Sequence, residues 1–131
     1  MKIAVITDDM KTISAHFGRA QHYLVFTAEN GKITGKESRP KANHNHFVSH
    51  EQGHGQAEPH GTDPQSEVKH ASMMETIIDC DVLLAGGMGR GAYDSLRLRS
   101  IQPVITDIQD AQEAVEAYLA GEIIDHPERL H

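Results

Sequence analysis

Short apolar runs alternate with polar, glycine-containing connections along this chain, and that alternation is typical of an α/β fold. The run Lys2–Thr7 is apolar at both alternating sets of positions, which predicts a central strand buried on both faces. Val82–Ala85 predicts a second strand of this kind, and Gln102–Thr106 predicts a shorter one. We therefore expect a sheet whose central strands are covered on two sides.

A β-hairpin is expected between Thr7 and the second buried strand. Its two arms are His22–Ala28, which is rich in aromatic and β-branched residues, and the polar run Lys32–Ser38. Asn30-Gly31 lies between the arms, and this pair favours a two-residue hairpin turn because both central positions need positive φ. The polar arm is typical of a strand at a sheet edge.

Three segments carry apolar residues at helical spacing. They are Asp63–Ile78, the segment from the glycines after Ala85 to about Ser100, and Asp110–Gly121. The first opens with the Asp-Pro pattern of a capped helix start, and the last ends at a glycine. The polar tail that follows, to His131, is expected to be frayed.

These elements predict one mixed sheet. The hairpin makes its two arms antiparallel, and right-handed crossovers place the fourth strand parallel to the first and the fifth beyond it. The expected strand order is therefore 3-2-1-4-5, in an α/β domain with three helices. In that order the first, third and fourth strands all end at the same rim of the sheet, where open α/β sheets bind ligands.

The stretch from about residue 39 to residue 63 is poor in apolar residues and rich in histidine and glycine. We expect it to be a long loop inserted into a single domain that spans residues 1–131. Imidazole suits zinc, nickel, iron and copper, and mixed short spacings allow several rings to converge on one ion. The candidate metal ligands are His44, His46, His50, His54 and His60 in this loop, and His16 outside it.

Composition narrows the function classes. A net charge of −7 and an aromatic content of 5% argue against a general nucleic-acid binder and against a protein that binds membrane surfaces. No apolar run reaches the length of a membrane span. Cys80, the only cysteine, excludes an intrachain disulfide and a four-cysteine metal site, and it favours the reducing cytoplasm.

Two short motifs carry the binding chemistry. Four glycines fall within six positions directly after the fourth strand, and such a strand–turn–helix start aims backbone N–H groups at one point. The other motif, Ser14-Ala-His-Phe-Gly-Arg-Ala20, supplies a cation and a histidine. The candidate binding residues are Ser14, His16, Phe17, Gly18 and Arg19 in one motif and Gly86, Gly87, Met88, Gly89, Arg90 and Gly91 in the other.

Other binding chemistries remain open at this point. Gly87-x-Gly89-x-x-Ala92 fits a loose dinucleotide fingerprint with Asp107 after the next strand, so a phosphate- or nucleotide-binding module is one alternative. A divalent-metal protein that uses the histidine-rich loop alone is another. Asp8 and Asp9 after the first strand could hold magnesium. No nucleophile–base pair is recognisable, so we expect a binding protein rather than an enzyme.

The two motifs together resemble the dinitrogenase iron-molybdenum cofactor biosynthesis family. The resemblance rests on Ser14-x-His-Phe-Gly-Arg-Ala20, on Gly86-Gly-Met-Gly-Arg-Gly-Ala-Tyr-x-x-Leu96 and on Ile101-x-Pro-Val104. It implies a ribonuclease H-like fold and non-catalytic binding of iron–sulfur or iron–molybdenum clusters, or their precursors, for cofactor-assembly partners. Some relatives carry cysteines near their metal loops, whereas this chain would have to hold a cluster by histidine and by hydrogen-bond donors.

Overall fold

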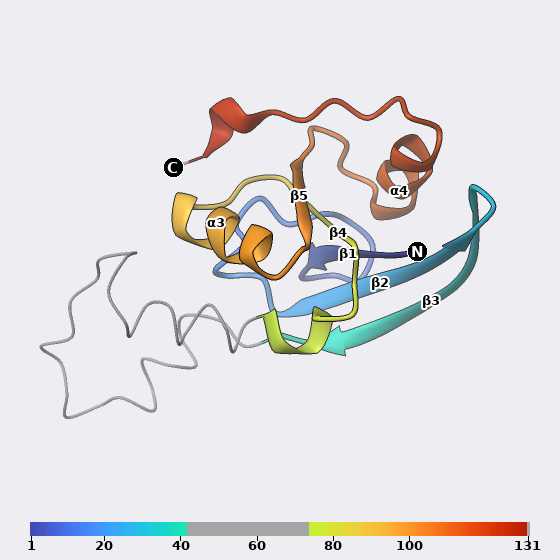
Figure 1. Ribbon diagram of the computed structural model, residues 1–131, viewed down its shortest axis with the longest axis horizontal. Helices are drawn as coiled ribbons and strands as arrows, with labels where there is room; N and C mark the ends of the chain where they lie inside the picture. The colour runs from blue at the N-terminus through green and yellow to red at the C-terminus, as the bar shows by residue number, and fades with distance from the viewer. Residues whose placement is uncertain (42–73, 131) are drawn as a thin grey trace, which may run out of the picture.

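The computed structural model describes residues 1–41 and 74–130, which form an α/β fold (Figure 1). The strands are β1 (Lys2–Thr7), β2 (His22–Glu29), β3 (Lys32–Pro40), β4 (Val82–Ala85) and β5 (Gln102–Ile105). The α-helices in these ranges are α3 (Arg90–Leu98) and α4 (Ala111–Leu119), and the 3-10 helices are η1 (Glu75–Ile77) and η2 (Pro127–Arg129). The strands form one sheet in the order β3-β2-β1-β4-β5, so the predicted order is confirmed.

Strand directions and the hairpin also follow the prediction. β1 pairs antiparallel with β2 and parallel with β4, and β4 pairs parallel with β5. Asn30 and Gly31 have φ of 54° and 79°, so both central positions of the hairpin turn are left-handed as expected. Pairing between β2 and β3 shifts once, at Thr27 and Ala28.

The sheet separates two apolar layers. Because successive side chains of a strand point to opposite faces, Ile6 of β1 belongs to the layer under α3 and η1, and Val5 belongs to the layer under α4. Leu96 of α3 and Val115 of α4 are fully buried in their respective layers. Figure 1 shows α3 and η1 together on one side of the sheet and α4 on the other.

β3 is longer than the sequence pattern predicts, because it continues through Arg39 and Pro40 instead of ending at Ser38. A long-range contact explains the extension. The Arg39 guanidinium donates through Nη1 to Asp79 Oδ1 at 2.6 Å and to the Thr76 carbonyl at 2.8 Å. β3 therefore includes the first two residues of the stretch, from about residue 39, that the sequence pattern assigns to the histidine-rich loop.

The helices agree with prediction where they can be compared. α4 begins after Asp110, whose carboxylate accepts from the Glu113 N–H at 2.9 Å, and Gly121 closes the turn after it with φ of 74°. The predicted helix over Asp63–Ile78 lies outside the described residues up to residue 73. Its last turn is the 3-10 helix η1, which buries Met74 and Ile77.

The tail from Glu122 to Leu130 is anchored by specific contacts, which corrects the prediction that it is frayed. The His126 N–H donates to the Ile105 carbonyl at 2.8 Å, and the Asp125 carboxylate accepts from the Ile105 N–H at 2.9 Å. Leu130 forms a bridge with Met88 in the glycine-rich loop. The tail thus covers the outer edge of β5, which would otherwise offer unpaired backbone groups to other strands.

Neither α-helix in the described ranges has the length and hydrophobicity that crossing a bilayer requires.

Candidate functional site

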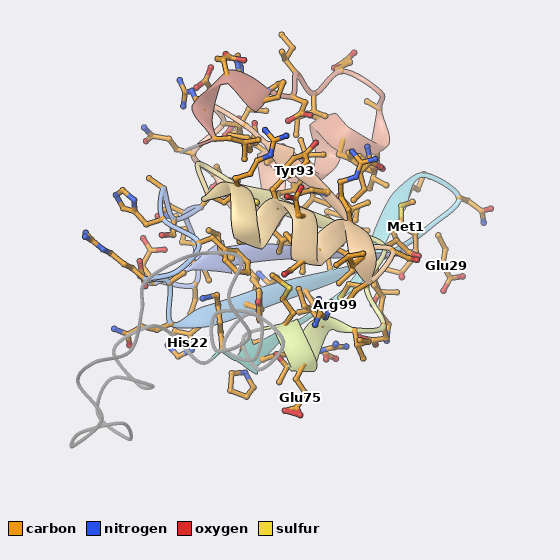
Figure 2. All side chains as sticks on the ribbon, turned by 60° about the vertical axis from the view of Figure 1, so that its left-hand side comes forward. Met1, His22, Glu29, Glu75, Tyr93 and Arg99 are labelled. Atoms are coloured by element: carbon orange, nitrogen blue, oxygen red, sulfur yellow. The ribbon has the colours of Figure 1, made fainter. Side chains whose placement is uncertain are left out.

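The candidate site lies at the rim of the sheet where β1, β3 and β4 end. His22, which pairs with Thr7 and Pro40, marks this rim in Figure 2, while Met1 and Glu29 mark the opposite end. The loop after β1, the loop after β4 and the loop after β5 all leave from the rim. This is the position at which open α/β sheets place their ligand sites.

The structure brings the two sequence motifs into direct contact. We call residues 14–20 the serine–histidine segment and residues 86–91 the glycine loop. The Gly86 N–H donates to the Ser14 carbonyl at 2.9 Å, and the Phe17 N–H donates to the Gly87 carbonyl at 3.2 Å. The Ser14 N–H in turn donates to the Ile6 carbonyl of β1 at 2.9 Å. Motifs about 70 residues apart therefore form one backbone-linked unit.

Close packing, not left-handed backbone, explains the first glycine of this loop. A Cβ on Gly86 would lie 3.0 Å from the Ala15 Cα and 3.1 Å from the Ser14 carbonyl oxygen, so no larger residue fits without moving the backbone. Among the described glycines, only Gly31 and Gly121 have positive φ. Gly89 has φ of −80°, and Gly91 lies inside α3.

The glycine loop ends at the N-terminus of α3. Gly89 precedes the helix and carries no side chain that could cap it, and the first bond of the helix runs from the Tyr93 N–H to the Gly89 carbonyl at 3.1 Å. The N–H groups of the first turn therefore point out of the helix without intrahelical acceptors. Together with the helix dipole they favour a negatively charged group at this end of α3.

The predicted binding side chains divide into exposed and buried sets. His16, Arg19 and Arg90 are exposed at the rim. Arg90 Nε lies 3.9 Å from Asp94 Oδ2, an exposed pair of little energetic weight. Phe17 and Met88 are each only 1% exposed and belong to the core, so they support the two segments from beneath. A ligand on the surface of this rim would meet the exposed set.

Of the predicted metal ligands, His44, His46, His50, His54 and His60 lie outside the described residues. Within residues 1–41 and 74–130, no group of three or more histidine, cysteine or acidic side chains could hold a metal ion. Cys80 is buried at the opposite end of the sheet, before β4, and burial raises the pKa of its thiol to about 11. The thiolate that a metal requires is therefore disfavoured there.

The acidic residues after β1 organise their own loop. The Asp9 carboxylate accepts from the Lys11 N–H at 2.9 Å and from the N–H and hydroxyl of Thr12, each at 2.7 Å. These bonds hold the pKa of Asp9 well below its ordinary value. Asp8 Oδ1 accepts from the Gln21 N–H at 3.1 Å. Both carboxylates therefore have a structural role, which leaves the suggested magnesium site without support.

A cavity of about 370 Å³ lies at the rim beside the contact of the two motifs. Its walls include Thr12, Ala15, Gly86, Thr106, Asp107 and Arg129. Sequence reasoning noted Asp107 only as part of a dinucleotide fingerprint, and it missed Arg129 because the tail carries no periodic pattern. The position of Thr106 and Asp107 directly after a strand that ends at this rim is the signal that could have identified them.

Lys41 is a second feature that the sequence pattern does not reveal. It follows β3 at the rim and is only 7% exposed. Its ammonium donates to the Ala20 carbonyl at 3.2 Å and lies 4.6 Å from the ring centre of Phe17 and 5.9 Å from that of Tyr23. Burial lowers the pKa of this amine to about 8. Lys41 thus ties the end of β3 to the serine–histidine segment through its cation–π contact with Phe17 and its hydrogen bond to Ala20.

Comparison with solved structures shows the same fold in three other proteins. A candidate dinitrogenase from Methanocaldococcus jannaschii has 12% identity and a TM-score of 0.63, over 97% of this chain and 95% of that one. A candidate NifB protein from Thermotoga has 20% identity and a TM-score of 0.60, over 95% and 91%. The apo form of the orange protein from Desulfovibrio gigas has 20% identity and a TM-score of 0.64, over 96% and 92%.

Comparison with curated proteins found no match. Comparison with protein families matched residues 1–121 to the dinitrogenase iron-molybdenum cofactor family. The match includes both motifs at the rim, the sheet and both of the described α-helices. This chain therefore belongs to the dinitrogenase iron-molybdenum cofactor family.

Proposed function

We propose that this protein binds and carries an iron–sulfur or iron–molybdenum cluster, or a precursor of one, for the assembly of a metallocofactor, and that it catalyses no reaction. The observation that carries the proposal is the hydrogen-bonded contact between the serine–histidine segment and the glycine loop at the rim of the sheet. Membership of the family supports the choice of cargo. The single cysteine favours the reducing cytoplasm as the place of this function.

The exposed groups of the two segments suit an anionic cluster. Arg19 and Arg90 supply positive charge, and the first turn of α3 supplies backbone N–H groups. His16 is exposed and offers an imidazole nitrogen to a metal at the surface of the cluster. Contacts of this kind are weaker than thiolate bonds, and weak contacts suit a carrier because the cargo must be handed on.

Anaerobic reconstitution tests the proposal. The protein is loaded with an iron–sulfur cluster and with an iron–molybdenum cluster, and binding is followed by visible absorption and by metal and sulfide analysis. We expect the double variant Arg19→Gln, Arg90→Gln to bind at least about tenfold more weakly, because charge-assisted contacts contribute about 1.5–3 kcal/mol each. Arg97→Gln is the control for the loss of a single charge, because it removes one positive charge from an exposed position in the last turn of α3, and it should bind the cluster as the wild type does.

The same preparations separate the alternatives. A colourless protein that holds zinc or nickel would favour a divalent-metal protein that uses the loop histidines. Nucleotide or phosphate in the extract, without metal, would favour a phosphate-binding module. Equal cluster binding by the double variant and by the wild type would contradict the site proposed at the rim.

A further inference from the structure

The cavity at the rim contains a buried polar group with unused hydrogen-bonding capacity. Thr106 is only 2% exposed, and it lines the cavity. Its hydroxyl oxygen accepts from the Ile108 N–H at 3.1 Å, but its hydroxyl hydrogen has no acceptor within the part of the chain that the structure describes. A buried donor without a protein acceptor is costly, so this hydrogen is available to an acceptor atom that enters the cavity.

A second donor enters the cavity from the tail. Arg129 lies in η2, and its guanidinium pairs through Nη2 with Asp107 Oδ1. Backbone contacts hold the tail on both sides of this residue, through His126 to Ile105 and through Leu130 to Met88. The position of Arg129 therefore does not depend on Asp107 alone.

Asp107 pairs with the Arg129 guanidinium in the way that a bound anion would. Its other oxygen, Oδ2, lies 3.0 Å from His126 Nε2, so the carboxylate already has two cationic or donor partners. A ligand with one carboxylate would offer Arg129 only what Asp107 offers already. A tetrahedral dianion has twice the charge and four acceptor oxygens, so it can displace Asp107 and reach Thr106 as well.

We propose that this cavity is a second ligand site, separate from the cluster site, and that it takes a small tetrahedral dianion. Arg129 and Thr106 are its donors, and Asp107 is a built-in competitor that keeps the affinity low. Gly86 and Ala15 form a wall that the cavity shares with the contact of the two motifs. A free phosphate and a metal oxyanion such as molybdate share this chemistry, and the experiment distinguishes between them.

Equilibrium titration of the full chain with sodium molybdate and with inorganic phosphate tests the proposal. Asp107→Asn removes the competing charge, so it should tighten binding about fivefold or more, whereas Arg129→Gln should weaken it about tenfold. Thr106→Val should weaken binding several-fold, and Thr106→Ser, which keeps the hydroxyl, should restore it. Asp94→Asn and Arg97→Gln make the same charge changes at exposed positions of α3 and should bind as the wild type does.

The outcomes are decisive once circular dichroism has shown that each variant is folded. A gain for Asp107→Asn together with a loss for Arg129→Gln supports the site, and the anion that binds more tightly identifies the source. Binding of neither anion, by the wild type or by Asp107→Asn, overturns the proposal. So does an affinity that Asp107→Asn leaves unchanged. Anion binding that follows these expectations while cluster reconstitution fails would contradict the cluster function and leave this site standing.

Discussion

At the scale of single residues, Gly86 shows how packing at one atom position controls the candidate site. Because it has no side chain, the Ser14 carbonyl and the Ala15 backbone can pack directly against the Gly86 backbone. We expect Gly86→Ala to lower the free energy of unfolding by about 1–3 kcal/mol, because the backbone of one segment must move. Gly35→Ala is the control, since a Cβ there would meet Thr27 Cβ at 3.8 Å, an ordinary contact. Urea unfolding measures both, and equal stability of the two variants would contradict this account.

Lys41 leads to a prediction about pH. The pKa of its amine is about 8 in the folded protein, below its ordinary value of 10.5. Between these two pH values the unfolded chain therefore holds a proton that the folded chain has released. The folded state therefore gains stability as pH rises through this window, and the gain is absent below it. The stability of the wild type relative to Lys41→Met should rise by about 1–3 kcal/mol between about pH 7.5 and about pH 10.

The effect of Lys41 must be measured as a difference between the wild type and Lys41→Met, because Cys80 changes stability with pH in the opposite direction. Burial raises the pKa of its thiol from 9.0 to about 11, so its contribution is present below pH 9 and is lost as pH rises toward 11. Both proteins contain Cys80, and the difference between them isolates Lys41. Lys36→Met, on the exposed part of β3, should follow the wild type at every pH. A parallel course of the Lys41→Met and wild-type curves would show that Lys41 is not desolvated in solution.

At the scale of elements, the tail from Glu122 to Leu130 acts as a cover for the edge of β5. The N–H of Ile105 faces the outer edge of β5 and donates to the Asp125 carboxylate. Pro103, two residues earlier in the strand, has no N–H. Asp125→Ala should cost about 1 kcal/mol, because it leaves that N–H without its acceptor. Glu122→Ala, at an exposed position of the same tail, should cost less than about 0.5 kcal/mol. Urea unfolding of both variants decides, and an equal loss would mean that the edge is held by other contacts.

At the scale of the whole molecule, the two apolar layers connect β1 and β2 to the elements that follow residue 73. The segment of residues 43–61 contains few apolar residues. Replacing them with a short Gly-Ser linker should therefore change the free energy of unfolding by less than about 1 kcal/mol, since loop closure depends weakly on length. Unfolding of this variant would contradict the division into a core domain and an inserted loop.

The linker variant also tests the histidine ligands. Any divalent metal held by His44, His46, His50 and His54 should be lost with the segment. In the intact chain it should leave as pH falls from about 7 to about 5, because imidazolium does not bind metal. Metal analysis of both proteins across that range is the measurement. Metal that stays with the linker variant would place its ligands elsewhere in the chain.

The sequence by itself determined the strand order, the hairpin and the meeting of two motifs at one rim. These follow from local signals: the apolar pattern of β1 and β4, the Asn30-Gly31 turn, and the handedness of crossovers between parallel strands. Each signal lies within a few residues or comes from a rule that holds for nearly all connections between parallel strands. The family resemblance added the expected cargo, which the fold alone does not specify.

Only the tertiary structure decided where β3 ends, that the tail is anchored, and that Thr106, Asp107 and Arg129 share a cavity. These features depend on contacts between distant residues, such as Arg39 with Asp79, which lie 40 positions apart, and Ile105 with Asp125, which lie 20 apart. A contact of this kind joins two groups, in side chains or in the backbone, whose positions have no periodic relation in the sequence. It is defined only when the sheet has brought its partners together, and for that reason no local pattern predicts it.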